Sequence, residues 1–180
     1  LCSIGAKIVW TGRRQVKIVG VKTFKQSNYK IMFDRIEAGT MLIAGAINQG
    51  NLKITGIESS ILKTEIDLLK KIGAKINQKK NEITIKGNKK IKNINIKTSP
   101  FPGVATDIQA QLMVLLCKAN KRSTIKEDIF ENRFQSVPEL KRMNAKIEVK
   151  GNQAIIEGNT IFKGAQVMAT DLRASASLVL

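Results

Sequence analysis

The chain has 180 residues, of which 43% are hydrophobic, so it can fill the core of one ordinary domain or of parts of two. Its net charge of +17 would suit nucleic acid, but Lys is spread along the chain and aromatic residues are only 4%, so nucleic-acid binding is the minority interpretation. The chain has no histidine and no metal-ligand cysteine spacing, which excludes His-based catalysis and most zinc sites, so no metal and no redox cofactor are expected. No apolar run is long enough to span a bilayer, so no membrane partner is expected either. The expected setting is the reducing cytoplasm.

The first 20 residues are expected to end a helix and then form a β-hairpin. Gly5 suits the left-handed position that ends a helix, and the segments 6–10 and 15–19 alternate as two paired strands. The same pattern returns at 69–86 and at 140–157. There the turn position is taken by Gly73 and by Asn144, and Asn is the other residue that tolerates the left-handed conformation.

A second pattern, a helix start, also occurs three times. The copies are Asp34-Arg35-Ile36-Glu37-Ala38, Thr106-Asp107-Ile108-Gln109-Ala110 and Thr170-Asp171-Leu172-Arg173-Ala174. We expect Asp34, Thr106 and Thr170 to be N-caps, with Glu37 and Gln109 completing capping boxes three residues later. Both patterns recur about every 70 residues, which is longer than a helical solenoid repeat and suits a larger supersecondary unit.

Arg173 occupies the capping-box position of the third copy, where it is unable to accept a hydrogen bond. Its charge also lies at the positive end of the helix dipole, which is unfavourable by a few tenths to about 1 kcal/mol. Two explanations are open. Arg173 is either part of an anion site at the helix N-terminus, or it forms an ordinary salt bridge with Asp171 or another acid.

The remaining elements follow from hydrophobic periodicity and from breaker residues, and the fold class that they predict is mixed α/β (α+β), made of repeated two-helix, four-strand units. We expect residues 1–32 to end one three-unit domain and residues 33–180 to form most of the next, so that the chain is part of a longer protein. The first complete unit is predicted as helix 34–48, strand 51–55, helix 60–72, hairpin 74–86 and strand 91–98. The second is predicted as helix 106–120, strand 123–126, helix 135–143 and hairpin 145–157, and a third unit begins at Thr170.

Three further stretches point to a family. The chain resembles UDP-N-acetylglucosamine enolpyruvyl transferases over essentially its whole length. The resemblance rests on Thr106-Asp107-Ile108-Gln109-Ala110-Gln111, on Phe130-Glu131-Asn132-Arg133-Phe134 and on the long motif from Gly164 to Ser175. The first helix start, at Asp34, is a further match. The resemblance implies two similar three-unit domains, the inside-out α/β barrel of the enolpyruvyl transferases, with the active site between them. The sister family acts on shikimate 3-phosphate. It would carry a Lys-Glu-Ser-Asp-Arg-like motif in place of Phe130-Glu131-Asn132-Arg133-Phe134, so the amino-sugar family is favoured.

The implied reaction transfers enolpyruvyl from phosphoenolpyruvate to the 3-hydroxyl of UDP-N-acetylglucosamine and releases phosphate, at the start of peptidoglycan precursor synthesis. By resemblance, Asp107 is the general base that contacts this hydroxyl, although an acid in a first helical turn is also favourable without any catalytic role. Ile129 and Phe130 would line the UDP-sugar site, with core packing as the alternative. Arg173 would lie near the phosphoenolpyruvate and phosphate site.

Two further site residues carry open alternatives. Arg133 matches an arginine near the cleft, and it either faces substrate or forms an interdomain ion pair. Asp171 would orient neighbouring groups, with a simple first-turn acid as the alternative.

The chain also departs from the family pattern. Ala105 stands where the family usually has Pro, which frees the loop before Asp107. Neither Cys2 nor Cys117 matches the family's mobile-loop cysteine, and the early Lys-Asn pair and the later arginine of the cleft have no counterpart here. The 180-residue chain alone is therefore expected to be inactive and to need the N-terminal and C-terminal parts of the same enzyme.

Overall fold

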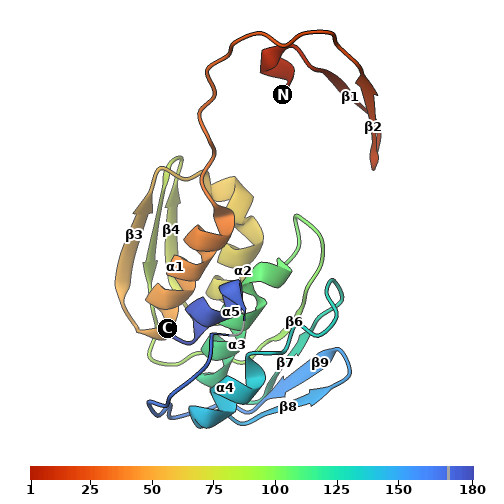
Figure 1. Ribbon diagram of the computed structural model, residues 1–180. Coiled ribbons are helices and arrows are strands. Elements are labelled where there is room, and N and C mark those ends of the chain that lie inside the picture. The colour runs from red at the N-terminus through yellow and green to blue at the C-terminus, as the bar shows by residue number, and fades with distance from the viewer. Residues whose placement is uncertain (170) are drawn as a thin grey trace. The chain divides into compact units, whose positions relative to one another are not determined.

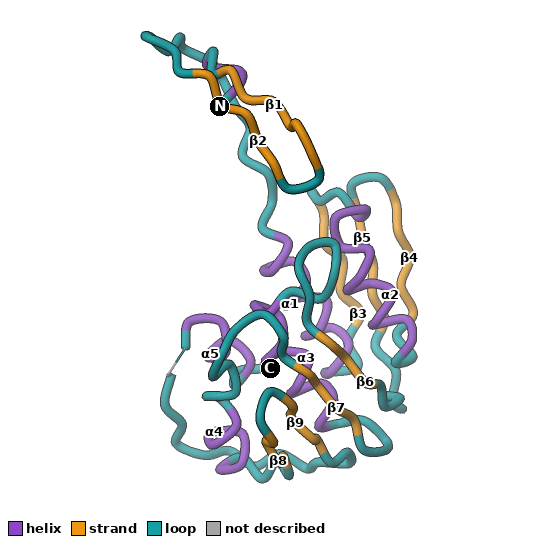
Figure 2. The backbone as a smooth tube through the Cα atoms, turned by 90° about the vertical axis from the view of Figure 1, so that its right-hand side faces the viewer, coloured by secondary structure: helices purple, strands orange, loops and turns teal. Residues whose placement is uncertain are grey.

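The computed structural model describes residues 1–169 and 171–180, and the chain divides into two compact units, Leu1–Met32 and Phe33–Leu180. Thr170, predicted to be the third helix cap, lies outside the described residues. Figures 1 and 2 show the elements of each unit. Within the described part of the chain, no helix combines the length and the apolar character needed to cross a membrane.

The first unit is a short 3-10 turn, η1 (Cys2–Ile4), followed by a hairpin of β1 (Lys7–Gly12) and β2 (Gln15–Val19). Gly5 ends the turn with φ 99°, as the sequence predicts. The hairpin leaves large apolar side chains in solvent: Trp10 is 76% exposed and Ile18 is 70% exposed. A two-stranded ribbon of this kind has no core of its own.

The second unit begins with α1 (Arg35–Ile47), β3 (Asn51–Thr55), a 3-10 turn η2 (Ser59–Leu62), α2 (Lys63–Lys71), β4 (Lys75–Lys79) and β5 (Glu82–Lys86). The three strands form an antiparallel sheet in the order β3-β5-β4. Asp34 caps α1, as predicted, because its Oδ1 accepts from the backbone N–H groups of Ile36 and Glu37. Gly73 ends the helix before the hairpin with φ 110°.

The second half of this unit contains β6 (Asn95–Lys97), η3 (Thr106–Ile108), α3 (Gln109–Cys117), β7 (Ser123–Lys126), α4 (Val137–Arg142), β8 (Ile147–Lys150) and β9 (Gln153–Ile156). Its sheet has the order β6-β7-β9-β8, and β6 runs parallel to β7. The strand predicted at 91–98 is therefore shorter and pairs with the following unit. Asn144 has φ 77°, as expected for the turn before β8. The last helix, α5 (Leu172–Ser177), begins the third copy.

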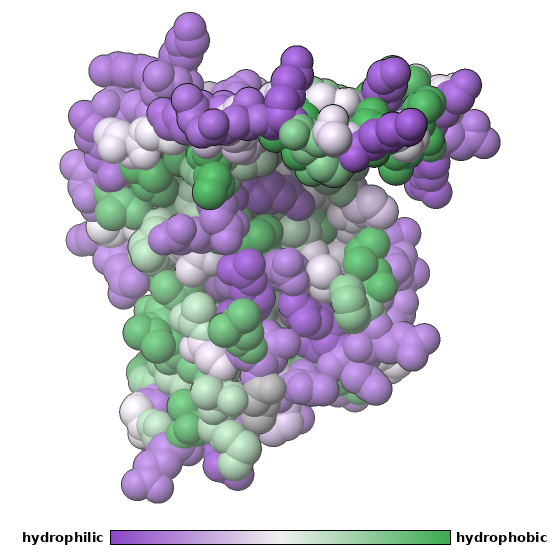
Figure 3. Space-filling model, turned by 45° about the horizontal axis from the view of Figure 1, so that its top comes forward, coloured by the Kyte–Doolittle hydropathy of each residue, from purple (hydrophilic) through white to green (hydrophobic). Residues whose placement is uncertain are grey.

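The core lies around α3, which packs against α1, α5, β7 and β9 (Figure 1). Every residue of α3 is buried, which is the pattern of a helix enclosed on all sides. The close approach of α1 to η3, the turn that leads into α3, needs a small residue on α1, since a Cβ at Gly39 would lie 2.4 Å from Cδ1 of Ile108. Outside this core, hydrophilic and hydrophobic side chains are interspersed on the face shown in Figure 3.

Two of the three predicted helix caps need correction or qualification. Thr106 does not cap its helix: Ala105 is the N-cap of η3, and the Thr106 hydroxyl instead donates to Oε2 of Glu127. Gln109 completes no capping box: among the described residues, its side-chain oxygen accepts no backbone N–H from the start of η3, and the side chain is buried with its Nε2 unpartnered. In the third copy the cap is Asp171, so Arg173 is the second residue of α5 and not the third after its cap.

Candidate active site

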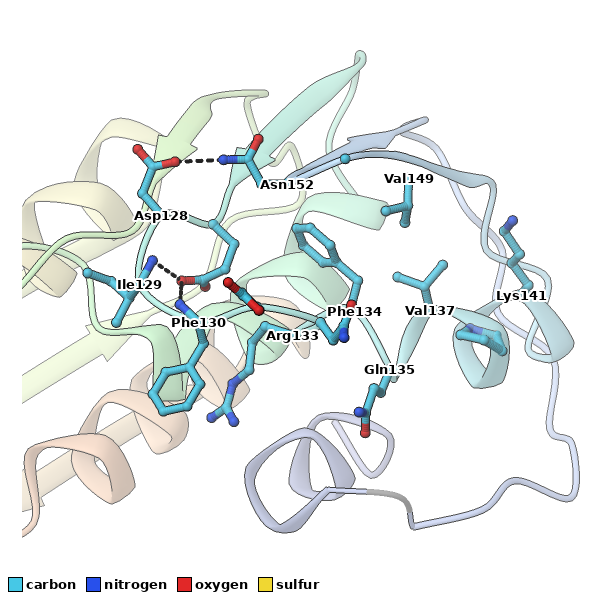
Figure 4. A pocket seen from close by; sticks show the side chains of 15 residues that line it. Asp128, Ile129, Phe130, Arg133, Phe134, Gln135, Val137, Lys141, Val149 and Asn152 are labelled. Carbon is cyan, nitrogen blue, oxygen red and sulfur yellow. Dashed lines mark hydrogen bonds between the residues drawn. The ribbon is translucent and has the colours of Figure 1, made fainter.

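The segment between β7 and α4 forms one side of an open cavity of about 1030 Å³ (Figure 4). The cavity is lined by residues 127–135, the start of α4 and the turn between β8 and β9. At one edge, Nδ2 of Asn152 donates to Oδ1 of Asp128 at 2.8 Å, which ties the segment to the β8–β9 turn. Ile129, Phe130 and Arg133, three of the predicted site residues, all line the cavity from this segment.

Arg133 links the segment to two helix starts. Its Nη2 lies 2.7 Å from Oδ1 of Asp107, and its Nη1 lies 3.2 Å from Oδ2 of Asp171. The guanidinium carbon also lies 5.5 Å from the centroid of the Phe130 ring, within cation–π range. The ion pair is not the interdomain pair that the sequence offered as an alternative, because Arg133 and both partners belong to the same unit.

Asp171 lies at the start of α5, where it both caps the helix and pairs with Arg133. Its Oδ1 accepts from the backbone N–H groups of Ala174 and Arg173, at 2.8 and 2.9 Å, while Oδ2 faces Arg133. The hydrogen bond from Ala174 N–H and the charge of Arg133 lower the pKa of Asp171 below its ordinary value, although partial burial opposes the shift. Asp171 is therefore a helix cap and an ion-pair partner at once.

Arg173 reaches from α5 to the start of α1. Its Nη2 lies 3.6 Å from Oδ2 of Asp34, and the two side chains are 38% and 44% exposed. This is the ordinary salt bridge that the sequence left open, with Asp34 as the acid. Because both side chains remain partly exposed, Arg173 is still accessible to a ligand from solvent.

Ile129 and Phe130 are not packed in the core, which excludes the alternative given for them. They are 40% and 59% exposed, and their backbone N–H groups both donate to Oε1 of Glu127, at 2.8 and 3.1 Å (Figure 4). Their exposed side chains border the cavity. Glu127 itself is 2% exposed and was missed by the sequence analysis, because an acid directly after a short strand carries no motif of its own.

The site thus joins Asp107, Phe130, Arg133 and Asp171 in one connected group, while Arg173 contacts Asp34 beside it. In residues 1–169 and 171–180, no cluster of three or more His, Cys, Asp or Glu side chains could hold a metal ion. The arrangement offers a half-exposed carboxylate next to paired guanidinium groups. Such groups can accept a proton and bind anionic oxygens.

Comparison with solved structures defines the class. The enolpyruvyl transferase NikO from Streptomyces tendae superposes with a TM-score of 0.88 at 27% identity, covering 99% of this chain and 43% of that one. EPSP synthase from Acinetobacter baumannii gives a TM-score of 0.71 at 19% identity, which supports the fold alone. The chain has the enolpyruvyl transferase fold, incomplete at this length.

The family follows from sequence. Residues 1–180 match the family described as EPSP synthase (3-phosphoshikimate 1-carboxyvinyltransferase), and the chain belongs to that family. Among curated relatives, proteins from Pelagibacter ubique and Geotalea uraniireducens are 65% and 46% identical over 180 residues, and both are named UDP-N-acetylglucosamine 1-carboxyvinyltransferase. The chain spans 43% of the length of each. The resemblance to the amino-sugar enzymes is confirmed.

Proposed function

We propose that the chain is part of a cytoplasmic enzyme that transfers enolpyruvyl from phosphoenolpyruvate to the 3-hydroxyl of UDP-N-acetylglucosamine, releasing phosphate. This reaction supplies peptidoglycan precursors, and through them cell-wall growth, cell shape and cell division. The observation that carries the proposal is the 65% identity, over all 180 residues, to a relative named for this activity. The connected group around Arg133 gives the proposal a physical site.

Asp107 is the proposed general base. Its side chain is 43% exposed, and its ion pair with Arg133 uses only Oδ1. Oδ2 is therefore placed to accept the proton of a sugar hydroxyl, which becomes a competent nucleophile only when this proton is removed. Positioned base catalysis of this kind contributes about 10²–10⁴-fold.

The same site would bind the substrates. Ile129 and Phe130 present exposed apolar surface at the cavity for the UDP-sugar. Arg173 is the proposed contact for the phosphate or carboxylate of phosphoenolpyruvate, which would compete with Asp34 for the guanidinium. Arg133 and Asp171 hold Asp107 and the start of α5 in place. Arg133, which lies beside Phe130, is the proposed second contact for the UDP-sugar.

The division of the chain supports a two-domain enzyme. We assign residues 1–32 to the end of the first three-unit domain, since the hairpin leaves its apolar side chains exposed and needs a partner to cover them. Residues 33–180 would be most of the second domain.

The chain alone would not turn over substrate, because burial raises the pKa of the Cys117 thiol to about 12 and the family's reactive cysteine has no match here.

The second candidate is transfer to shikimate 3-phosphate. The description of the matching family favours it, whereas Phe130-Glu131-Asn132-Arg133-Phe134 in place of the Lys-Glu-Ser-Asp-Arg-like motif favours the amino sugar. The two candidates differ in the acceptor alone, so one assay with two acceptors separates them.

The test is phosphate release by a chimera in which this chain replaces the matching segment of the Pelagibacter ubique relative. With phosphoenolpyruvate present, release is expected with UDP-N-acetylglucosamine and not with shikimate 3-phosphate. Asp107→Asn should lower kcat by about 10²–10⁴-fold, since the amide accepts no proton. Release with shikimate 3-phosphate only, or none from a folded chimera, would overturn the proposal. Retained activity in Asp107→Asn would remove Asp107 from the role of base.

A further inference from the structure

Glu127 is a buried acid that has no part in the chemistry proposed above. It directly follows β7, and its side chain sits beneath the loop that carries Ile129, Phe130 and Arg133. The residue is 2% exposed, and yet both of its carboxylate oxygens have partners. Burying a carboxylate costs free energy unless hydrogen bonds replace those it made to water. The hydrogen-bond partners of Glu127 therefore indicate its structural role.

Four donors from three segments converge on this carboxylate. Oε1 accepts from the backbone N–H groups of Ile129 and Phe130, at 2.8 and 3.1 Å, and from the Thr98 hydroxyl at 2.8 Å. Oε2 accepts from the Thr106 hydroxyl at 3.0 Å. All four groups donate, and the two oxygens of a carboxylate have enough lone pairs to accept from all of them.

These bonds connect the two halves of the site. Thr106 is the residue before Asp107 at the start of η3, and Ile129 and Phe130 begin the loop that forms the cavity wall. Thr98, which is 0% exposed, extends the network because its hydroxyl also accepts from the backbone N–H of Asp128 at 3.0 Å. The Glu127 carboxylate therefore fixes the separation between the helix start that carries Asp107 and the loop that carries Ile129 and Phe130.

We infer that Glu127 is a positioning residue, which sets Asp107 and the 128–130 loop at the separation that the sugar nucleotide requires. Its two oxygens divide the task. Oε2 holds the start of η3, and so the base, through Thr106. Oε1 holds the loop through two backbone N–H groups and, with Thr98, supports the turn at Asp128. This role rests on the proposed function, because it concerns the geometry of that reaction.

The division of the network allows the two effects to be measured separately. Thr106→Val is nearly isosteric and removes only the bond to Oε2, so the helix start that carries Asp107 loses this tether while the loop stays anchored. In the chimera it should lower kcat by about 10- to 100-fold, since a misplacement of about 1 Å can cost that much, with KM for the UDP-sugar changed less than about 3-fold. Thr98→Val removes the hydroxyl that supports the loop at Asp128 and Oε1, and should raise that KM with a smaller change in kcat.

A second readout needs no activity. In the 180-residue chain, amide hydrogen exchange at Ile129 and Phe130 should be slow for an exposed loop, because both N–H groups are bound by the carboxylate. Glu127→Asp keeps the charge but shortens the side chain by one methylene, and should speed this exchange by at least about 10-fold. Glu157→Gln, which changes an exposed partner of Arg122, is the matched control and should leave both exchange rates unchanged.

The outcomes separate the two proposals. A kcat loss in Thr106→Val together with a KM rise in Thr98→Val supports the positioning role, whereas equal, parallel losses in both variants would mean that the network only stabilises the fold and would overturn it. If the wild-type chimera releases no phosphate, the proposed function fails, and the amide exchange rates alone then test whether Glu127 anchors the loop. Unchanged exchange in Glu127→Asp would then overturn the inference.

Discussion

The ion pair between Arg133 and Asp171 is the contact that joins α5 to the cavity loop, and its energy can be measured. The change is a double-mutant cycle of Arg133→Met and Asp171→Asn. Asn is a good N-cap, so this substitution keeps the start of α5 while removing the charge. The side chains are 20% and 26% exposed and lie 3.2 Å apart. Because the pair is only partly screened, we expect a coupling of about 0.5–1 kcal/mol, at the upper end of the range for exposed pairs.

The assay is urea unfolding of the four chains at neutral pH in low salt. At about 1 M salt, where the Debye length is about 3 Å, the coupling should fall by half or more. The pair of Arg122 and Glu157 is the matched control, since its side chains are 67% and 42% exposed, and its cycle should give a value closer to zero. A coupling below about 0.3 kcal/mol in low salt, within the usual error of additivity, would refute the view that this ion pair holds α5 against the loop.

Three further predictions concern stability and reactivity. A maleimide should label Cys2 in the folded chain, whereas Cys117, with 0% exposure and a pKa raised to about 12, should react only after denaturation; labelling of a folded Cys2→Ser variant would contradict this. Because the pKa of Asp171 is lowered on folding, its contribution to stability is present above its unfolded pKa and is lost as pH falls through the folded value. Wild type should thus lose more stability in urea titrations below about pH 4 than Asp171→Asn, and equal losses would count against the assignment. Gly158→Ala should lower the free energy of unfolding by about 1–3 kcal/mol in thermal denaturation, because the new Cβ would meet a backbone oxygen at 2.1 Å, whereas Gly164→Ala, with open space around it, should match wild type.

Local patterns predicted most of the fold. The hairpins and the helix ends before them depend on neighbours in sequence, and the turn positions at Gly5, Gly73 and Asn144 all have positive φ. Strand 51–55 and helix 34–48 were correct to within a residue or so for the same reason. What the sequence did not reveal is that the strand before η3 pairs with the following sheet, because a parallel partner is chosen by packing over a long separation and not by local periodicity.

The candidate site was only partly visible in the sequence. The motifs selected Asp107, Ile129, Phe130, Arg133, Asp171 and Arg173, and the structure places them around one loop and two helix starts. The roles of these residues stay predictions. Thr106 was taken for a helix cap because its residue type and spacing fit one, but its hydroxyl points to the buried carboxylate of Glu127, the residue after β7, and donates to it. Such competition depends on tertiary contacts, so Glu127 had no signal in the sequence.

The repeated helix start explains why these charges meet. Helices α1 and α5 each begin at an aspartate that uses one oxygen to cap its helix and the other to face an arginine. Asp34 faces Arg173 of the third copy, and Asp171 faces Arg133, which in turn holds Asp107 of the second. Three copies of one local motif thereby become a line of ion pairs.

This line has a consequence for substrate binding. It contains three carboxylates and two guanidinium groups, so both arginines are already paired, although the chain as a whole carries a charge of +17. An anionic substrate would gain little from either arginine without displacing a carboxylate, since the local charge is not positive. Under the proposed function, tight binding of phosphoenolpyruvate therefore needs cations from outside this line. The family's early Lys-Asn pair and later cleft arginine have no counterpart in this chain, so we expect the chimera to bind phosphoenolpyruvate more tightly than the 180-residue chain, which calorimetry with both proteins would measure.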